Sequence, residues 1–364
     1  MNIALVHDWL TNVAGAERVL LTLHEIYPEA PIYTSVFDPK KAKPFADLNI
    51  KTSVLQKFPL LKKHRELLVP LTPFAFENIN LSKYDVVISS TTFAAKGVIT
   101  KPETVHICYC HTPTRYLWMP ELDPRSDSGN FSWLRKKIRP KLLEWDKAAA
   151  QRVDYYISNS DYTGRRIKKF YNRNSVTVYP PVDVNRFKIA GADRVKDHYL
   201  FVSRLVGYKR CDIVVEAFNK LGLPLKIIGS GPEKKRLQKI AKSNIEFLGF
   251  LSDDELRKYY EEAKAFIFAA EEDFGIVPVE AMSAGRPVIA FGRGGAKETV
   301  VPGITGEFFE NQSWESLAEV VKTFNPDKYN PETIRKHAKQ FSEERFKKEF
   351  RATVEKMVEE YNKD

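Results

Sequence analysis

The sequence predicts an α/β fold made of two Rossmann-like domains, each with a parallel sheet. Short apolar runs typical of buried strands alternate with amphipathic helical segments along the chain, as expected for successive β-α-β units. One cycle of this pattern ends near a Tyr-Pro-Pro segment, and a second cycle follows it. With 364 residues, the chain is long enough for two domains with separate cores.

The first cycle opens with an apolar strand at 3–6, a loop that contains Gly15, and a helix at 16–26. Val19, Leu20, Leu23 and Ile26 share one face of that helix, which predicts contact with the sheet. Further predicted strands are 32–37, 86–89, 105–110, 155–158 and 175–178, and further predicted helices are 131–152 and 161–170.

The boundary between the two domains is predicted at the Pro180-Pro181 pair. Consecutive prolines cannot continue a strand, so this segment is typical of a linker. We therefore expect domains at 1–180 and 181–345, followed by an amphipathic helix at 346–364. The second domain is expected to contain strands 199–202, 225–229, 245–248, 265–269 and 287–291 and helices 211–220, 232–242 and 278–283.

Composition indicates a soluble globular protein, with 43% hydrophobic and 29% charged residues. No apolar run approaches the roughly 18 residues that span a bilayer. The N-terminus passes directly into a strand and lacks a basic region, so we expect no signal peptide. The three cysteines are too few for a disulfide framework and lack a zinc spacing, which indicates buried thiols in a reducing cytoplasm.

The net charge of +10 predicts an anionic partner. Basic residues at 51–65, among them Lys62, Lys63 and Arg65, alternate with leucine, phenylalanine and proline, which is typical of an interfacial segment. An anionic membrane or a lipid-diphosphate acceptor would suit it. Basic runs at 135–141 and 165–173 are typical of solvated helix faces. We expect no nucleic-acid partner, because no binding motif accompanies the charge.

The segment 271–289, EEDFGIVPVEAMSAGRPVI, carries the most specific pattern in the chain. Glu272 and Glu280 lie eight positions apart, the first in a loop after an apolar strand and the second in the following helix. Ligands bind beyond the carboxyl ends of strands in open parallel sheets. Backbone amides after Gly275 lie at a helix N-terminus and suit an anion. The pattern therefore suits a sugar nucleotide, with one carboxylate for sugar hydroxyls, amides for phosphate and one carboxylate for ribose.

A second cluster, Ser203 to Lys209, follows the first strand of the second domain. Two fixed cations, Arg204 and Lys209, would stabilise the charge that grows on a departing nucleoside diphosphate. The chain contains no Asp-x-Asp sequence of the kind that anchors a metal. We therefore expect no metal ion and no cofactor beyond the nucleotide-sugar substrate.

Three residues of the first domain are also candidates. Gly15 opens the first helix, where a glycine allows close approach of a phosphate or acceptor. His111 follows the strand at 105–110 and is placed to bond a sugar hydroxyl. Arg115, four residues later, is a candidate for an acceptor phosphate.

The 271–289 segment resembles the E-x7-E pattern of retaining nucleotide-sugar glycosyltransferases of family 4, which have the GT-B fold of two Rossmann-like domains facing a cleft. The resemblance implies that Glu272 and His111 are catalytic residues. It implies a last helix that crosses back to the first domain. It also implies which residues contact each part of the substrates. The donor diphosphate would contact Arg204, Lys209, Gly15, Ile276 and Val277, and the donor sugar would contact Glu272, Asp273, Phe274, Gly275 and His111. The nucleoside would contact Glu280, Gly229, Phe250 and Leu251, and the acceptor would contact Arg115.

The first domain resembles mannosyltransferases of O-antigen and surface-polysaccharide assembly in its HDWL…GAERVL, PIYTSVFDP and YCHTPTRYLW segments. This implies transfer of mannose from GDP-mannose to a lipid-linked saccharide, by a cytoplasmic protein peripheral to the inner membrane face. Ala14 and Met119 depart from the family pattern, which has glycine and aspartate there. A UDP-hexose donor is the nearest alternative, and a non-catalytic sugar-nucleotide-binding protein is another.

Overall fold

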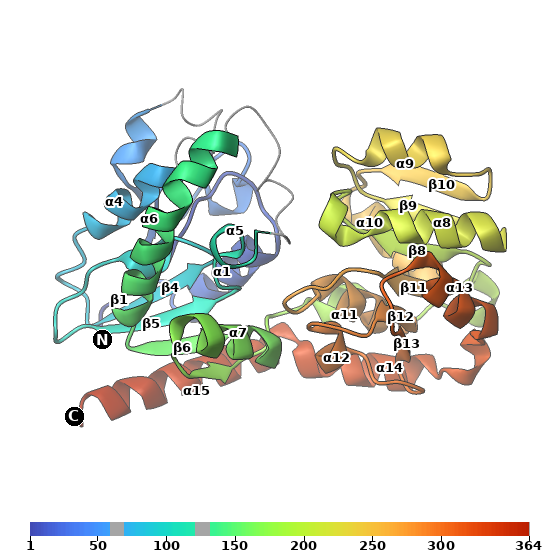
Figure 1. Cartoon of the computed structure of the whole chain (residues 1–364). Coiled ribbons are helices and arrows are strands. Elements are labelled where there is room, and N and C mark those ends of the chain that lie inside the picture. Colours follow the sequence, from blue (N-terminus) through green and yellow to red (C-terminus); the bar gives the residue numbers. More distant parts are fainter. Residues whose placement is uncertain (59–68, 121–131, 364) are drawn as a thin grey trace. The chain divides into compact units, whose positions relative to one another are not determined.

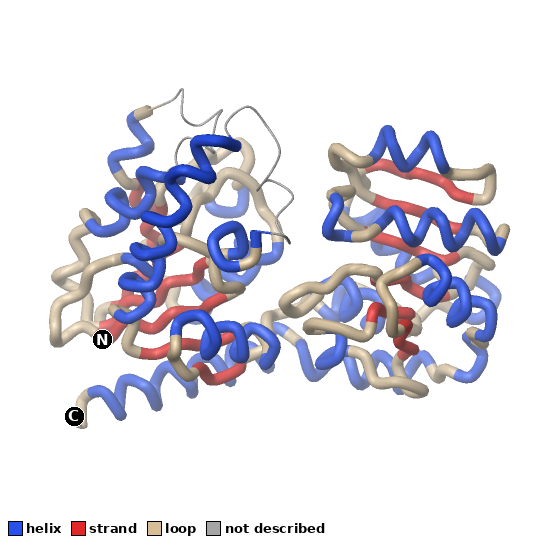
Figure 2. The backbone as a smooth tube through the Cα atoms, viewed as in Figure 1, coloured by secondary structure: helices blue, strands red, loops and turns tan. Residues whose placement is uncertain are grey.

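The computed structural model describes residues 1–58, 69–120 and 132–363. It contains two compact units, Met1–Pro181 with Glu344–Asp364, and Val182–Glu343. Each unit is a sheet with helices packed against it (Figure 1; Figure 2). The predicted α/β class with two parallel sheets is confirmed.

The sheet of the first unit has seven strands, and each strand is parallel to its neighbours. Their spatial order is β3 (Ile50–Thr52), β2 (Ile32–Thr34), β1 (Ile3–His7), β4 (Val86–Thr91), β5 (Val105–Cys110), β6 (Tyr155–Ser158) and β7 (Ser175–Thr177). The α-helices that the structure describes in this unit are α1 (Gly15–Ile26), α4 (Thr72–Glu77), α5 (Arg115–Trp118), α6 (Ser132–Gln151), α7 (Asp161–Tyr171) and α15 (Glu343–Tyr361).

The sheet of the second unit has six strands, again all parallel. Their spatial order is β10 (Ile245–Gly249), β9 (Leu225–Ile228), β8 (Tyr199–Val202), β11 (Ala265–Phe268), β12 (Val288–Phe291) and β13 (Gly306–Phe309). The α-helices are α8 (Cys211–Leu221), α9 (Lys234–Ile240), α10 (Asp253–Glu262), α11 (Ile276–Ser283), α12 (Ala296–Thr299), α13 (Trp314–Thr323) and α14 (Pro331–Ala338).

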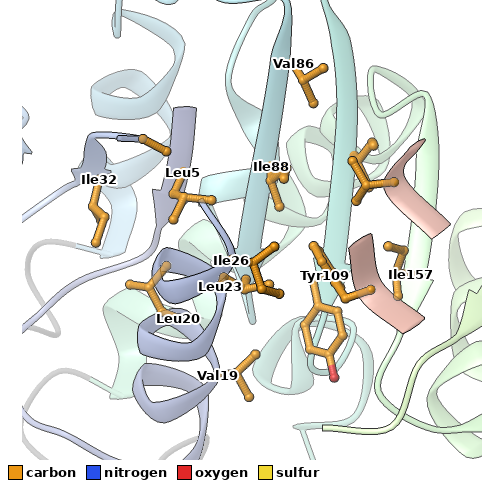
Figure 3. Close-up of a cluster of buried hydrophobic side chains, with 14 of the residues drawn as sticks. Leu5, Val19, Leu20, Leu23, Ile26, Ile32, Val86, Ile88, Tyr109 and Ile157 are labelled. Atoms are coloured by element: carbon orange, nitrogen blue, oxygen red, sulfur yellow. The ribbon is translucent and has the colours of Figure 1, made fainter. Parts of the chain in front are cut away.

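Successive side chains of each strand point to opposite faces of the sheet, so the core of the first unit is divided between these two faces. Leu5, with Ile88 and Tyr109, packs against the apolar face of α1 (Figure 3). Ala4 and Val6 point to the opposite face and pack in a separate cluster with residues of α4, α5 and α6. Both faces of the sheet are therefore buried, as the continuous apolar runs in the sequence predict.

The last helix, α15, belongs to the first unit although it follows the second unit in sequence. Phe346, Phe350, Val354 and Met357 recur at helical spacing and are buried in the same cluster as α1. Burying each such side chain stabilises the fold by about 1.5–3 kcal/mol. A hydrogen bond also joins α15 to the end of α1, since the Arg351 guanidinium donates to the Ile26 carbonyl at 3.3 Å.

Several predicted elements differ in extent from the observed ones. The strand predicted at 32–37 ends at Thr34, and Ser35 donates from its amide and its hydroxyl to the Asp8 carbonyl. The helix predicted at 278–283 starts two residues earlier, after Gly275 at a φ of 87°. The predicted interfacial residues Lys62, Lys63 and Arg65 lie outside the described residues. Within the described ranges, no helix has the length and apolarity needed to cross a bilayer.

Asp8, directly after β1, fixes the loop that follows β4. Its carboxylate accepts hydrogen bonds from the amides of Thr92, Phe93, Ala94 and Ala95 at 2.7–3.1 Å. Burial alone would raise the pKa of Asp8, but the neighbouring His7 charge and these amides lower it below its ordinary value. The carboxylate therefore stays ionised and anchors the loop.

His7 and Glu17 form a second buried charged pair, which joins β1 to the first turn of α1. The His7 Nε2 and Glu17 Oε1 atoms are 3.9 Å apart, and His7 Nδ1 lies 2.7 Å from the Ser90 carbonyl. Burial lowers the pKa of His7, but hydrogen bonding and the charge of Glu17 outweigh it, and the pKa is raised overall. Burial likewise acts to raise the pKa of Glu17, yet the interaction with His7 lowers it overall.

A third buried charge, Asp146 in α6, connects four segments of the first unit. Its Oδ1 atom lies 2.6 Å from Lys96 Nζ, and both side chains are almost completely buried. The same carboxylate accepts hydrogen bonds from Thr114 Oγ1, Trp118 Nε1 and Tyr171 OH at 2.7–2.9 Å. Because every partner is a donor, the buried negative charge is satisfied on both oxygens.

Replacing Asp146 by asparagine is expected to destabilise the first unit by about 3–5 kcal/mol, because Lys96 is left buried without a counter-charge. Urea unfolding followed by tryptophan fluorescence would measure the loss. Trp314 is the only tryptophan in residues 182–343, so the signal reports mostly on the first unit. As a control, Glu360→Gln removes an exposed partner of Lys356 at 3.7 Å and should cost less than about 1 kcal/mol. Equal losses in the two variants would contradict the role given to Asp146.

The His7–Glu17 pair is expected to make stability depend on pH. The raised pKa of His7 means that its contribution is complete below its ordinary value of 6.5 and is lost as pH rises through the raised value. The lowered pKa of Glu17 means that its contribution is complete above 4.5 and is lost as pH falls. The coupling should therefore be greatest between these two values.

A double-mutant cycle of His7→Gln and Glu17→Gln measures this coupling in urea unfolding. We expect about 0.5–3 kcal/mol near pH 5.5 and a smaller value near pH 9. A coupling that is the same at both pH values would show that charge is not its origin.

Candidate functional site

The winding of the second sheet reverses between β8 and β11. Strands β9 and β10 extend the sheet on the β8 side, and β12 and β13 extend it on the β11 side. The loops that leave β8 and β11 therefore lie together at the carboxyl edge, where open sheets bind ligands. These loops contain Lys209 and Glu272, and the Lys209 Nζ atom forms an ion pair with the Glu272 Oε1 atom. The two side chains are only 15% and 18% exposed. The structure thus brings together a predicted diphosphate cation and the predicted sugar-binding carboxylate.

Arg204 lies in the same loop after β8, and its side chain is exposed. The backbone on either side is fixed, because the amides of Ser203 and Leu205 donate to the carbonyls of Ile228 and Ser230 at 3.0 and 2.9 Å. Leu205 is fully buried. In the part of the chain that the structure describes, no ion pair occupies the Arg204 guanidinium. A rigid backbone therefore presents this cation to solvent.

The Gly229-x-Gly231 turn holds this loop in place through close contact of two backbones. A Cβ atom on Gly229 would lie 1.9 Å from the Ser203 carbonyl oxygen, and one on Gly231 would lie 2.2 Å from that of Leu205. Only glycine permits these approaches. The structure thus gives Gly229 a positioning role toward Ser203, and contact with a nucleoside stays a prediction.

A second pair of glycines supports the acidic loop after β11. A Cβ atom on Gly294 would lie 2.4 Å from the Glu272 carbonyl oxygen, and one on Gly295 would lie 2.3 Å from the Phe274 Cα. The Gly295 amide donates to the Glu272 carbonyl at 2.9 Å. The backbone that carries Glu272 is therefore fixed by the loop after β12.

The first turn of α11 presents the predicted phosphate-binding amides. The amides of Ile276 and Val277 are the first two of the helix and have no acceptor within it. Phe274 anchors the preceding loop, because it is buried and its ring centroid lies 5.5 Å from that of Phe341. Asp273 is also buried, at 8% exposure. This turn can offer donor groups and the positive end of a helix dipole to an anion.

Glu280 lies one turn into α11 and is buried, with an exposed fraction of 7%. The Tyr260 hydroxyl donates to its Oε2 atom at 2.8 Å. Tyr260 belongs to α10, which the sequence analysis did not predict. The capping box formed by Ser252 and Glu255 marks the start of α10 and could have revealed it.

Phe250 and Leu251 follow β10 at the same carboxyl edge. The Phe250 side chain is 85% exposed, which is unusual for a phenylalanine. The Gly229 amide donates to the Gly249 carbonyl at 2.7 Å, so this loop is joined to the one that supports Arg204. An exposed aromatic ring on a fixed backbone can stack on a planar ligand.

The remaining predicted residues, Gly15, His111 and Arg115, lie in the first unit. His111 follows β5, its Nε2 atom lies 2.8 Å from Ser90 Oγ, and its carbonyl accepts from Asn159 Nδ2 at 2.9 Å. Gly15 is the first residue of α1, and Arg115 is the first residue of α5. The predicted residues thus fall into two groups, one at the carboxyl edge of each sheet.

Family models match most of the chain in two consecutive parts. Residues 13–186 match Glycosyltransferase Family 4, and residues 185–344 match Glycosyl transferases group 1.

Curated proteins with related sequences include glycosyltransferases of several organisms. The alpha-1,3/1,6-mannosyltransferase ALG2 of Dictyostelium discoideum is 23% identical, with 95% of this chain and 94% of that protein aligned. A GDP-mannose-dependent alpha-(1-6)-phosphatidylinositol monomannoside mannosyltransferase of Mycobacterium tuberculosis is 31% identical over 44% of this chain. The aligned part spans 50% of the mycobacterial protein, and 56% of the uncharacterized glycosyltransferase MJ1178 of Methanocaldococcus jannaschii.

Solved structures share the whole architecture. Anabaena Alr3699/HepE in complex with UDP superposes with a TM-score of 0.74 at 19% identity, covering 98% of this chain and all of that one. The sucrose-phosphate synthase of Thermosynechococcus elongatus gives a TM-score of 0.75 at 17% identity, covering 98% and 99%. At these identities the likeness establishes the fold. Together with the two family models, it shows that the chain belongs to the glycosyltransferases of GT-B fold, with a family 4 domain followed by a group 1 domain.

Proposed function

We propose that this protein is a retaining hexosyltransferase that moves mannose from GDP-mannose to a lipid-linked saccharide during assembly of a cell-surface polysaccharide. The observation that carries the proposal is the ion pair of Lys209 with Glu272 at the switch between β8 and β11, beside the exposed Arg204. A cation and a carboxylate at this point suit the diphosphate and the adjoining sugar of a nucleotide sugar.

Arg204, Lys209 and the amides of Ile276 and Val277 would hold the donor diphosphate. As the glycosidic bond breaks, negative charge grows on the departing oxygen, and fixed cations stabilise this charge more in the transition state than in the ground state. Arginine supplies a planar fork and lysine a compact charge, so the two are complementary. In this proposal they take the place of a divalent metal.

Glu272 would orient the donor sugar by accepting hydrogen bonds from its hydroxyls. An acceptor hydroxyl attacks the anomeric carbon from the face that the diphosphate leaves, so the new bond keeps the configuration of the old one. The acceptor proton passes to the departing diphosphate oxygen, and no side chain needs to form a covalent intermediate. Contact of His111, in the first unit, with a sugar hydroxyl stays a prediction, and Glu280, held by Tyr260, would bind the ribose.

The choice of GDP-mannose is supported by the mannosyltransferases among the related sequences, several of which are GDP-mannose-dependent by name. A UDP-hexose is the second candidate, because HepE was solved with UDP and with UDP-glucose. Phe250 does not distinguish them, since an exposed ring can stack on either base.

Exposed apolar side chains support an acceptor at a membrane surface. Val54 and Phe58 before residues 59–68, and Leu71 and Phe74 after them, are 44–62% exposed. Lys57 lies among them, and the mixture of apolar and basic groups suits an anionic bilayer. These side chains support a peripheral location, and in this proposal the membrane face is the inner face of the cytoplasmic membrane.

Calorimetric titration with GDP, GDP-mannose, UDP and UDP-glucose tests the donor. We expect the guanosine compounds to bind at least tenfold more tightly than the uridine compounds, a difference of about 1.4 kcal/mol. The reverse order would favour the UDP-hexose alternative, and the absence of binding by any of the four would contradict the proposed function. NMR analysis of the product should show the anomeric configuration of the donor, and an inverted product would refute the retaining mechanism.

Glu272→Gln is expected to lower kcat by at least about 100-fold, because an interaction made with the reacting sugar is lost. The affinity for GDP should fall less than about fivefold, because Arg204 and the amides remain. Glu271→Gln is the matched control, an adjacent glutamate changed in the same way, and should keep most of the activity. Full activity of Glu272→Gln, or equal losses in both variants, would refute the assignment.

A further inference from the structure

The first unit contains a pocket of about 420 Å³ that the proposed reaction has not used. It lies between the end of α5 and one face of α7. Its walls combine three aromatic side chains, Trp118, Tyr162 and Phe170, with three cationic ones, Arg165, Arg166 and Lys169. The volume falls within the range of small-molecule sites, which is about 300–1,000 Å³.

The aromatic wall is held in place from behind. The Trp118 indole donates to Asp146 Oδ2 at 2.7 Å, and its ring stacks on Phe170 with centroids 4.9 Å apart. Asp146 is itself fixed by its buried ion pair with Lys96. The wall is therefore already ordered, and a ligand would lose little affinity to ordering it.

Two of the three cations that line the pocket have no acidic partner among the residues that the structure describes. Arg165 and Lys169 are exposed, and neither forms an ion pair with any residue in the described ranges. Arg166 is buried, donates to the Tyr162 hydroxyl at 2.8 Å and stacks on that ring at 4.2 Å. Lys147 adds a fourth charge, 5.5 Å from the Trp118 ring. Such a site attracts an anion with a flat or apolar neighbouring group.

The pocket is formed by elements that also carry or contact two predicted residues of the same unit, the acceptor residue Arg115 and the donor-sugar residue His111. Two residues, Asn159 and Ser160, separate the end of β6 from the start of α7, and Tyr162 lies in the first turn of α7. Asn159, between β6 and α7, donates to the His111 carbonyl at 2.9 Å. Helix α5 carries Arg115 at its start and Trp118 at its end. The Tyr162 end of the pocket therefore lies towards the carboxyl edge of the first sheet, where His111 is found, and Lys169 lies in the last turn of α7.

We propose that this pocket binds a phosphate-bearing part of the acceptor. The phosphate or diphosphate would contact Arg165 and Lys169, and the attached sugar would pack on Trp118 and Tyr162. Aromatic faces suit the C–H surface of a sugar ring, and exposed cations suit phosphate oxygens. The inference rests on the proposed transfer reaction and adds the group by which the acceptor is recognised. That phosphate belongs either to a lipid-diphosphate linkage or to a soluble phosphorylated saccharide.

Lys169→Ala and Arg165→Ala test the pocket, with Lys168→Ala as the matched control. Lys168 is the neighbouring lysine of α7, is exposed and does not line the pocket. NMR titration without any donor would compare mannose 1-phosphate, mannose, and a saccharide joined by diphosphate to a short prenyl chain in detergent. We expect the two pocket variants to weaken binding of the phosphorylated probes about tenfold each, and the control to change it less than about twofold.

Equal effects of Lys169→Ala and Lys168→Ala would overturn the inference, as would mannose binding as tightly as its phosphate. Tighter binding of the lipid-linked probe than of mannose 1-phosphate would support the site with the lipid source, and the opposite order would support it with the soluble source. Donor affinity is measured in the same variants and should stay unchanged. A protein that binds phosphorylated saccharide here but no nucleotide would support the pocket and contradict the proposed function, so the two failures are distinguishable.

Discussion

In each sheet, the direction in which successive strands are added reverses once, and the rest of the site depends on this reversal. In an all-parallel sheet the connecting helices cover both faces. At the reversal, the chain segments that leave two neighbouring strands turn to opposite faces of the sheet, and a crevice opens between their loops. In the second unit this point lies between β8 and β11, and there Lys209 meets Glu272. In the first unit it lies between β1 and β4, and there Asp8 fixes the loop after β4 through four amides. The same topological position holds a candidate binding pair in one unit and an internal anchor in the other.

Buried charge in the first unit serves to position exposed groups. Asp146 and Lys96 neutralise each other in the interior, and the Asp146 carboxylate also accepts hydrogen bonds from Thr114, Trp118 and Tyr171. Removing such charges from water is costly, so the arrangement is stable only with all its donors present. The ring of Trp118, held by this carboxylate, forms part of the wall of a pocket in which Arg165 and Lys169 are exposed to solvent. In the second unit, glycine pairs bring the backbones of neighbouring loops into direct contact and so hold the loops that carry Arg204 and Glu272.

The sequence predicted those features that depend on short-range patterns. Strand and helix alternation predicted the fold class, and the segment around Glu272 predicted a carboxylate directly after a buried strand and a helix after it. Contacts between residues far apart in the chain leave no local pattern in the sequence. Lys209 and Glu272 are 63 positions apart, and Lys96 and Asp146 are 50 apart, so only the folded chain pairs them. Strand β3 was missed because Ile50–Thr52 is a short edge strand with little apolar character.

Glycine roles were also beyond sequence analysis, because a Gly-x-Gly turn looks the same whether it contacts a ligand or another backbone. A Cβ atom on Gly229 or Gly231 would meet the carbonyl of Ser203 or Leu205, which shows backbone contact, and contact of Gly229 with a nucleoside stays a prediction. The exposure of Phe250 is a similar case, since composition alone favours a buried phenylalanine.

The position of α15 has a consequence for synthesis of the chain on the ribosome. Phe346, Phe350, Val354 and Met357 complete the hydrophobic cluster around α1, and the contact between Arg351 and Ile26 spans 325 positions. The amino-terminal lobe therefore emerges first but lacks part of its interior until translation has passed through the other lobe. Its final packing step must follow chain elongation, and closing so long a loop makes this a slow, non-local event.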